Sequence, residues 1–326
     1  MPSIISFGEA LIDFLAEVEL KSDTPGRFVQ HAGGAPANVA VAAAKLGTPA
    51  AFVGMLGQDM FGDFLLHSLN AAGVITDYLL RTDRANTALA FVSLDAHGER
   101  QFSFYRPPSA DLLFRPEHFQ DACFKDAAIF HACSNSLTEP GIAGATLEGM
   151  QRAHQAGALV SFDMNLRLNL WTGTADPRPW IWRALQEAEL VKLSATELAF
   201  LAEPLEGEAG ALKELWKGRT RWCWVTQGAG PIRYFTRHSQ DRLPVFNVQV
   251  VNTTAAGDAF VGGLLSWLVR EGVNASNLVA LLQDQARMQS ALRFASACGA
   301  LAVTRHGAFR AMPTLAEVQQ FLQAHP

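Results

Sequence analysis

Residues 250–263 read VVNTTAAGDAFVGG, and this stretch predicts the end of a strand, a turn of small residues and the start of a helix. Val250 and Val251 are β-branched and suit a strand, whereas the small residues after them allow successive backbone N–H groups to converge on an anion. The apolar run over residues 259–269 predicts a helix, whose N-terminal dipole adds roughly half a positive charge at the same place. A group at this junction lies where developing negative charge would be stabilised.

Asp258 stands at this junction, in the first turn of the expected helix. A carboxylate there could take the proton of an attacking alcohol. The backbone N–H groups of Ala255, Ala256 and Gly257 would meanwhile hold the charge of a transferred phosphoryl group. The same residues also fit an ordinary strand-to-helix turn in which Asp258 caps the helix. Taken alone, the stretch leaves both interpretations open.

A second stretch, residues 33–47, reads GGAPANVAVAAAKLG. It predicts a double-glycine turn, a helix of small residues with proline in its first turn, and a glycine stop. Gly34 would let backbone N–H groups come close to a ligand, and the amide of Asn38 can donate to and accept from sugar hydroxyls. The second stretch therefore favours the phosphoryl-transfer interpretation of the first.

Together the two stretches resemble the signatures of the ribokinase-like (PfkB) carbohydrate kinases, and within that family they are most like the bacterial fructokinases. The resemblance extends from residues 8–14, GEALIDF, to residues 299–308, GALAVTRHGA, and so covers almost the whole chain. It implies an α/β fold with a central, mostly parallel sheet flanked by helices and a small β-sheet lid.

The resemblance also implies a reaction, the transfer of the γ-phosphoryl group of ATP to a primary hydroxyl of a ketose with help from Mg2+. Fructose is the expected sugar, 2-keto-3-deoxygluconate is the alternative, and ribose or a nucleoside is less favoured. A non-catalytic sugar-binding sensor with a kinase fold is the alternative from a different class. The retained Asp258 argues against it.

Composition excludes several other classes. The 326 residues are 49% hydrophobic and 17% charged, which is enough apolar material to cover both faces of a parallel sheet in one domain spanning residues 1–326. The formal net charge of −5 argues against a nucleic-acid partner, which would need a basic face. There is no GxxxxGK[ST] loop, no HRD or DFG element, and no GxGxxG after the first expected strand, so P-loop, protein-kinase and Rossmann dehydrogenase readings lose support.

The N-terminus and the cysteines predict a soluble cytoplasmic protein. Glu9 and Asp13 interrupt the first apolar stretch, which lacks a basic region ahead of it, so we expect no signal peptide. No run of about 18 apolar residues suggests a membrane partner. The four cysteines, at positions 123, 133, 223 and 298, form no CxxC pair, so neither a zinc site nor a disulfide framework is indicated.

Short apolar runs alternate with helical stretches along the chain, which predicts βα units and a parallel sheet. The expected strands cover residues 4–7, 50–53, 128–131, 159–162, 190–193, 222–226 and 247–251. Residues 11–30 and 86–106 alternate like strands but lack helices, with a turn expected at His97-Gly98. By resemblance these two insertions form the lid over the sugar, and we expect the apolar outer face of the lid to be covered by a second copy in a homodimer.

Several polar residues are candidates for the sugar side. Asp13 follows the first strand at the edge where open α/β sheets bind ligands, although a solvated loop aspartate would look the same. Residues 161–167, SFDMNLR, alternate so that Asp163, Asn165 and Arg167 share one side of an extended segment, which also fits a structural ion pair. By resemblance the sugar that accepts the phosphoryl group is bound by Asp13, Gly33, Gly34, Asn38, Arg106, Asn165, Arg167 and Asp258. Arg106 could instead pair with the carboxylate of an acidic sugar.

A third group of residues is expected on the nucleotide side. Residues 192–197, KLSATE, begin a helix in which Ser194 and Glu197 form a capping box. By resemblance Glu197 helps to hold magnesium and its waters, and Ser194 stands where the strict family motif has Asn. The nucleotide-binding residues that the resemblance implies are Lys192, Ser194, Thr226, Gly228, Gly230, Ala297 and Gly299.

Asn252 departs from the family pattern, in which many members carry Asp at the head of this signature and some use it to bind a monovalent cation. An amide offers an oxygen ligand without the charge, and hard cations are held largely by charge and oxygen geometry. We therefore expect a weak monovalent cation site at Asn252.

Overall fold

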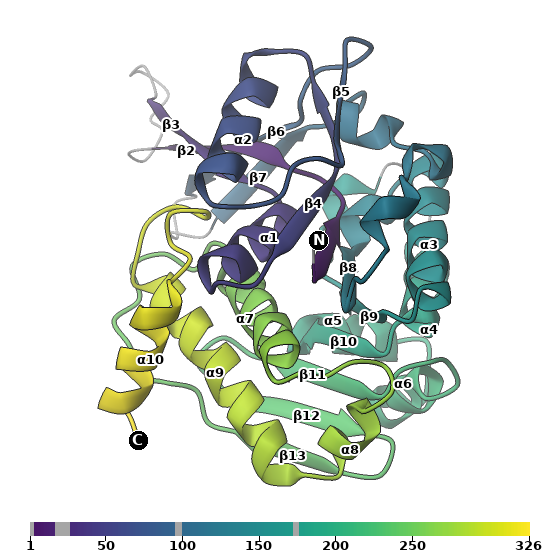
Figure 1. The fold of residues 1–326 in the computed structure, drawn as a ribbon, viewed down its shortest axis with the longest axis vertical. Helices are drawn as coiled ribbons and strands as arrows, with labels where there is room; N and C mark the ends of the chain where they lie inside the picture. The colour runs from purple at the N-terminus through teal and green to yellow at the C-terminus, as the bar shows by residue number, and fades with distance from the viewer. Residues whose placement is uncertain (1–2, 17–26, 95–99, 172–175) are drawn as a thin grey trace.

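A nine-stranded sheet forms the centre of the computed structural model, which describes residues 3–16, 27–94, 100–171 and 176–326. All neighbouring strands from β5 to β11 are parallel, and β12 and β13 add an antiparallel hairpin at one edge (Figure 1). The order across the sheet is β13 (Gln240–Leu243), β12 (Ile232–Thr236), β11 (Trp222–Thr226), β10 (Leu190–Ser194), β9 (Leu159–Asp163), β8 (Ile129–Cys133), β1 (Ile4–Phe7), β4 (Ala50–Gly57) and β5 (Leu79–Thr82).

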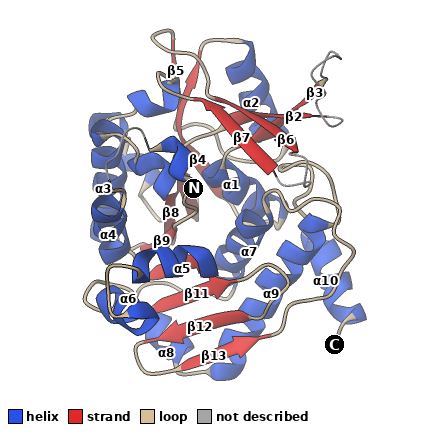
Figure 2. Cartoon of the chain, turned by 180° about the vertical axis from the view of Figure 1, so that it is seen from behind, coloured by secondary structure: helices blue, strands red, loops and turns tan. Residues whose placement is uncertain are grey.

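Helices cover both faces of this sheet because its strands are apolar on both sides. Successive residues of one strand enter different cores: Ile4 packs with the core under α1 and α7, whereas Ile5 packs with the core under α3 and α4. One layer contains α1 (Ala35–Lys45), α7 (Ala256–Arg270), α8 (Leu278–Leu282), α9 (Gln285–Val303) and α10 (Leu315–Ala324). The other contains α3 (Pro140–Gln155), α4 (Arg178–Glu187), α5 (Ala195–Ala202) and α6 (Gly207–Leu215) (Figure 2).

A separate four-stranded sheet lies at one end of the molecule, where the two helix-free insertions were expected to form a lid. Its order is β3 (Phe28–Gly33), β2 (Leu11–Ala16), β6 (Leu89–Leu94) and β7 (Arg100–Tyr105). Helix α2 (Met60–Ala71) packs between this sheet and β4. The His97-Gly98 turn and part of the 11–30 insertion lie outside the described residues.

Six of the seven predicted strands are confirmed, and the one at residues 247–251 is wrong. That segment is an irregular extended loop whose Val250 is 57% exposed, and it joins no sheet. It is anchored to the end of α9, where the N–H groups of Val251 and Asn252 donate to the carbonyl of Val303 at 2.8 and 3.0 Å. Val250, one of the two valines that suggested a strand, instead contributes to the wall of a cleft. The helix that follows begins at Ala256, three residues earlier than the apolar run alone indicated.

Candidate active site

Two cavities meet at the turn before α7, and Thr253 lines both. One, of about 460 Å³, is mostly apolar and is called the apolar cleft; the other, of about 280 Å³, is called the polar cavity. Ala256 and Gly257 face the apolar cleft, whereas Ala255 and Asp258 face the polar cavity. A group passed between ligands in the two cavities would cross the N-terminus of α7.

The turn before α7 leaves this helix end open. Ala255 has a left-handed backbone with φ of 59°, and no side chain caps the helix. The first N–H groups of a helix have no partner within it; here that of Ala256 makes one long contact, of 3.4 Å, with the carbonyl oxygen of Thr253, and Ala256 and Gly257 lie where the two cavities meet. Asn252 stiffens the approach, because its Oδ1 accepts the N–H of Thr254 at 2.7 Å.

A buried cation stands beside the same helix end. A Cβ added to Gly257 would lie 3.3 Å from Nζ of Lys192, so only glycine leaves the ammonium and the helix N-terminus so close. Lys192 pairs with Asp163 at 3.1 Å, and the carboxylates of Asp163, Glu197 and Asp258 raise its pKa against the effect of burial. The lysine therefore keeps its charge where an anion would arrive.

Asp258 is almost fully buried, with 9% of its surface exposed. Its Oδ2 accepts a hydrogen bond of 2.7 Å from Nδ2 of Asn38 on α1. Burial raises the pKa of Asp258 to about 7, opposed by the Asn38 hydrogen bond and by the charges of Lys192 and Arg167, while Asp163 raises it further. A carboxylate with such a pKa is suited to take a proton near neutral pH.

The polar cavity is walled by residues from both sheets. Gly34, with φ of 103°, lies against the backbone of Glu9 and Ala10, where a Cβ would come within 2.5 Å of the Glu9 carbonyl oxygen. Gly33 is required by the carboxylate of Asp13, whose Oδ2 would lie 2.1 Å from an added Cβ. The cavity is lined by Glu9, Leu11, Asp13, Gly34, Ala35, Asn38, Phe104, Asn135, Asn165, Arg167, Thr253, Thr254, Ala255 and Asp258.

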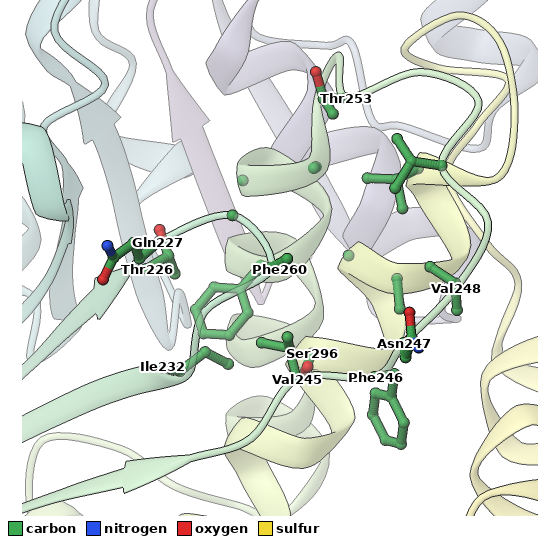
Figure 3. A pocket seen from close by; sticks show the side chains of 18 residues that line it. Thr226, Gln227, Ile232, Val245, Phe246, Asn247, Val248, Thr253, Phe260 and Ser296 are labelled. Atoms are coloured by element: carbon green, nitrogen blue, oxygen red, sulfur yellow. The ribbon is translucent and has the colours of Figure 1, made fainter.

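The apolar cleft lies between the loop that follows β13 and one face of α9 (Figure 3). Ser296, Gly299, Ala300 and Val303 follow each other at helical spacing on that face. A Cβ on Gly299 would lie 3.3 Å from the carbonyl oxygen of Ala256, so glycine keeps this wall flat beside the helix end. The opposite walls come from Thr226, Gln227, Gly228, Ala229, Ile232, Val245, Phe246, Asn247, Val248, Val250 and Phe260.

Most of the predicted site residues converge on these two cavities, but the structure places Arg106 and Ala297 elsewhere. Arg106 is 2% exposed, and its guanidinium donates twice to Oδ2 of Asp111, at 2.6 and 2.8 Å, and once to the Asn135 carbonyl oxygen. Ala297 is packed between helices, because it lies on the face of α9 that meets α10. Neither residue lines a cavity.

Four further residues support the site without lining it. Ser194 and Glu197 form the expected capping box, and Glu197 Oε1 also accepts the N–H of Leu166 at 2.8 Å. Gly230 closes the turn after β11, its N–H donating to the carbonyl of Gln227 at 2.7 Å. Asp163 pairs with Lys192 at 3.1 Å and does not line the polar cavity, and the left-handed backbone of Asn165 (φ 36°) interrupts the extended segment expected over residues 163–167.

Sequence reasoning missed Glu9 and Asn135, two polar residues of the polar cavity that lie outside the two signature stretches. Both follow parallel strands directly, Glu9 after β1 and Asn135 after β8, so both lie at the carboxyl edge of the sheet, where ligands bind in open α/β folds. A carboxylate interrupting the first apolar stretch and a polar run, Ser134-Asn135-Ser136, after an apolar strand were the available signals.

No group of three or more His, Cys, Asp or Glu side chains among the described residues is arranged to hold a metal ion. No helix among them combines the length and the apolar character needed to cross a membrane.

Comparison with known proteins identifies relatives over the whole chain. Residues 1–315 match the family of pfkB carbohydrate kinases. A probable fructokinase-4 of Arabidopsis thaliana is 42% identical over 324 residues, covering 99% of this chain and 97% of the relative.

Solved structures give the same result. A fructokinase from Xylella fastidiosa with bound ATP superposes with a TM-score of 0.95 at 54% identity, over 99% of both chains. A fructokinase from Vibrio cholerae O395 in a fructose, ADP and calcium ion bound form superposes with a TM-score of 0.85 at 33% identity, also over 99% of both chains.

Proposed function

The chain belongs to the PfkB family of carbohydrate kinases, and on this premise we propose that it is a fructokinase that binds fructose in the polar cavity and ATP in the apolar cleft. The observation that carries the assignment of the two sites is their meeting at one helix end. Asp258 faces one cavity while Ala256 and Gly257 face the other.

Asp258 acts as the general base. Its burial keeps the pKa close to neutral, so the carboxylate is a strong enough base to accept the proton of a primary hydroxyl as the oxygen attacks phosphorus. Asn38 fixes the carboxylate from the side by the 2.7 Å hydrogen bond, which leaves Oδ1 for the substrate. Asp13, Asn165 and Arg167 line the same cavity and are assigned to the sugar hydroxyls and the phosphate.

The charge on the transferred phosphoryl group is met by the backbone and by one side chain. The N–H groups at Ala255, Ala256 and Gly257 form the anion hole, and the Lys192 ammonium adds a fixed positive charge beside Gly257. Because this cation is buried and already paired with Asp163, it needs little reorganisation when negative charge develops next to it.

Magnesium fits this site through Glu197. The two carboxylate oxygens accept backbone N–H groups from Leu166 and Ser194, and each retains a lone pair that could accept from a water of the ion. When bound, magnesium neutralises phosphate oxygens in kinases of many folds.

The apolar cleft suits an adenine ring. Ile232, Val245 and Phe260 offer apolar surface, and Thr226, Asn247 and Ser296 supply a few polar groups (Figure 3). Gly228 and Gly299 keep the backbone accessible on two sides.

The charges of the polar cavity favour a neutral sugar over an acidic one. Three carboxylates, those of Glu9, Asp13 and Asp258, line it against a single cation, Arg167. Arg106, the other candidate partner for a sugar carboxylate, is committed to Asp111. This distribution supports fructose over 2-keto-3-deoxygluconate.

A coupled ADP-release assay over fructose, 2-keto-3-deoxygluconate, ribose, adenosine, glucose and mannose tests the function. We expect the highest kcat/KM for fructose. If activity on 2-keto-3-deoxygluconate exceeded activity on fructose tenfold, the assignment of fructose as the substrate would be wrong. If no sugar caused ADP release, the assignment of the protein as a kinase would be wrong. The four cysteines are free and buried, as expected for the cytoplasm, where we propose that the enzyme acts.

A further inference from the structure

Asn135 lines the polar cavity and carries a buried hydrogen-bond acceptor without a partner among the described residues. The residue is 6% exposed and lines the cavity, and its Oδ1 accepts no hydrogen bond from any residue that the structure describes. Leaving a buried amide oxygen unpaired is costly, so such an atom in a binding cavity indicates a ligand that donates to it. In a sugar site the available donors are hydroxyl groups.

The side-chain amide of Asn135 is oriented by Glu9, because its Nδ2 donates to Oε1 of Glu9 at 3.0 Å. The main chain at Asn135 is fixed separately, since the backbone carbonyl oxygen accepts from Nη1 of Arg106 at 2.7 Å. Glu9 Oε1 also receives the N–H of Ala35, which fixes the carboxylate in turn. Oε1 of Glu9 acts as an acceptor for the N–H of Ala35, so it selects the amide rotamer that keeps Nδ2 on Glu9 and leaves Oδ1 without a partner among the described residues.

We propose that Asn135 is a specificity-determining residue that accepts a hydrogen bond from one hydroxyl of the sugar, and that Glu9 is its positioning residue. The assignment rests on the proposed function, because it takes the polar cavity as the sugar site. It gives the buried carboxylate of Glu9 a role, because Glu9 holds the Nδ2 side of this amide. The amide and the carboxylates of Asp13 and Asp258 give the cavity an excess of acceptors, which matches a polyhydroxylated, uncharged ligand.

The test combines Asn135→Leu with fructose analogues that each lack one non-reacting hydroxyl: 1-deoxyfructose, 3-deoxyfructose, 4-deoxyfructose and 2,5-anhydromannitol. Asn135→Leu keeps the side-chain size and removes the acceptor, so KM for fructose should rise roughly 10- to 100-fold while kcat stays within about threefold. One analogue lacks the hydroxyl that Asn135 binds. With that analogue, KM of Asn135→Leu should be almost the same as KM of the unmodified enzyme. The amide of Glu9→Gln can donate to Oδ1 of Asn135 and so turn this acceptor away from the sugar. The rise in KM caused by Glu9→Gln should therefore be smaller with the same analogue than with fructose.

Ser134→Ala is the matched control, since Ser134 is the preceding residue, is fully buried and also has an unpaired oxygen among the described residues, but it does not line the cavity. KM should not change in this variant. Asn135→Ala repeats the test if the leucine variant melts early. An unchanged KM in the Asn135 variants, or an equal loss with every analogue, would overturn the proposal. If the unmodified enzyme preferred another sugar, the proposed function would be wrong, and the same series built on that sugar would still decide the role of Asn135.

Discussion

At Asp258, reactivity and stability make opposite demands. The carboxylate is most useful as a base when it is buried and hard to ionise, but an ionised buried carboxylate destabilises the fold. Asn38 and Lys192 offset part of that cost and leave the pKa at about 7. The residue therefore changes charge near neutral pH.

Replacing Asp258 with asparagine should lower kcat by at least about 100-fold, because the base is lost. Sugar affinity should change by only a few-fold, since the amide keeps the shape of the carboxylate. Steady-state kinetics with binding measured separately by calorimetry checks both. A variant with near-normal turnover would show that another group accepts the proton.

The pKa of Asp258 also sets two pH dependences. We expect kcat/KM to fall as the pH drops below about 7, where the base becomes protonated. Between about pH 4 and 7 the folded state binds more protons at this site than the unfolded state, so this residue makes stability fall as the pH rises. Asp258→Asn should therefore raise Tm at pH 8 and much less near pH 4, as thermal melts would show; equal shifts at both pH values would contradict the assignment.

Because Asn252 is uncharged, we expect the activity to depend little on potassium. Its Oδ1 is engaged by the N–H of Thr254, and the amide carries no charge to hold a cation. The measurement compares kcat/KM in potassium and in a bulky organic cation at matched ionic strength. Asn252→Asp should gain cation activation, whereas a large stimulation of the unmodified enzyme would refute the argument.

Among the elements, α1 and α7 are locked together by small residues. A Cβ on Gly262 of α7 would lie 2.5 Å from Cβ of Ala42 and 3.0 Å from the carbonyl oxygen of Val39, both on α1. The same two helices supply Asn38 and Asp258, so their spacing sets the hydrogen bond that aligns the base.

Gly262→Ala should therefore lower stability by about 1–3 kcal/mol and also lower kcat by roughly tenfold, because it pushes α1 away from α7. Chemical unfolding and steady-state kinetics measure the two effects. Gly144→Ala in α3 is the control: its Cβ meets open space, so the change should stabilise by about 0.5–1 kcal/mol and leave kcat unchanged. A loss of stability in Gly262→Ala without any loss of kcat would separate the helix spacing from catalysis.

The elements show what the sequence could and could not predict. Buried strands such as β1 and β11 were predictable because an apolar run between turns has one stable use in a parallel sheet. The 247–251 segment was not, because β-branched residues suit a cleft wall as well as a strand. Asp258 and Asn38 could be located from local motifs, whereas Arg106 could not, since its pairing with Asp111 depends on how the chain turns after β7.

At the scale of the whole molecule, the small sheet has one face toward the polar cavity and one away from it. Asp13 and Phe104 line the cavity, and the alternating neighbours Phe14 and Tyr105 belong to the other face. On that face Phe91 lies 5.0 Å from Phe14 and 5.3 Å from Tyr105, measured between ring centroids. Tyr105 is 67% exposed, so this aromatic row is open at one end.

We expect two copies of the chain to associate through this aromatic face, since a single exposed aromatic sheet would invite non-specific contacts. Sedimentation at micromolar concentration should show a dimer, and Tyr105→Glu should shift it to the monomer. Met60→Glu, which changes an equally exposed apolar residue on α2, should leave the dimer intact. A fully active monomer would refute the expectation.

The wall formed by the small sheet has a consequence for the fate of ATP. Asp258 would deprotonate a water molecule as readily as a sugar hydroxyl, and water at the helix end would turn the enzyme into a wasteful hydrolase. Leu11 and Phe104 of the small sheet add apolar surface to the wall of the cavity that Asp258 faces, in space that solvent would otherwise occupy. We therefore expect this wall to limit the cleavage of ATP by water, and so the number of ATP molecules consumed for each sugar that is phosphorylated.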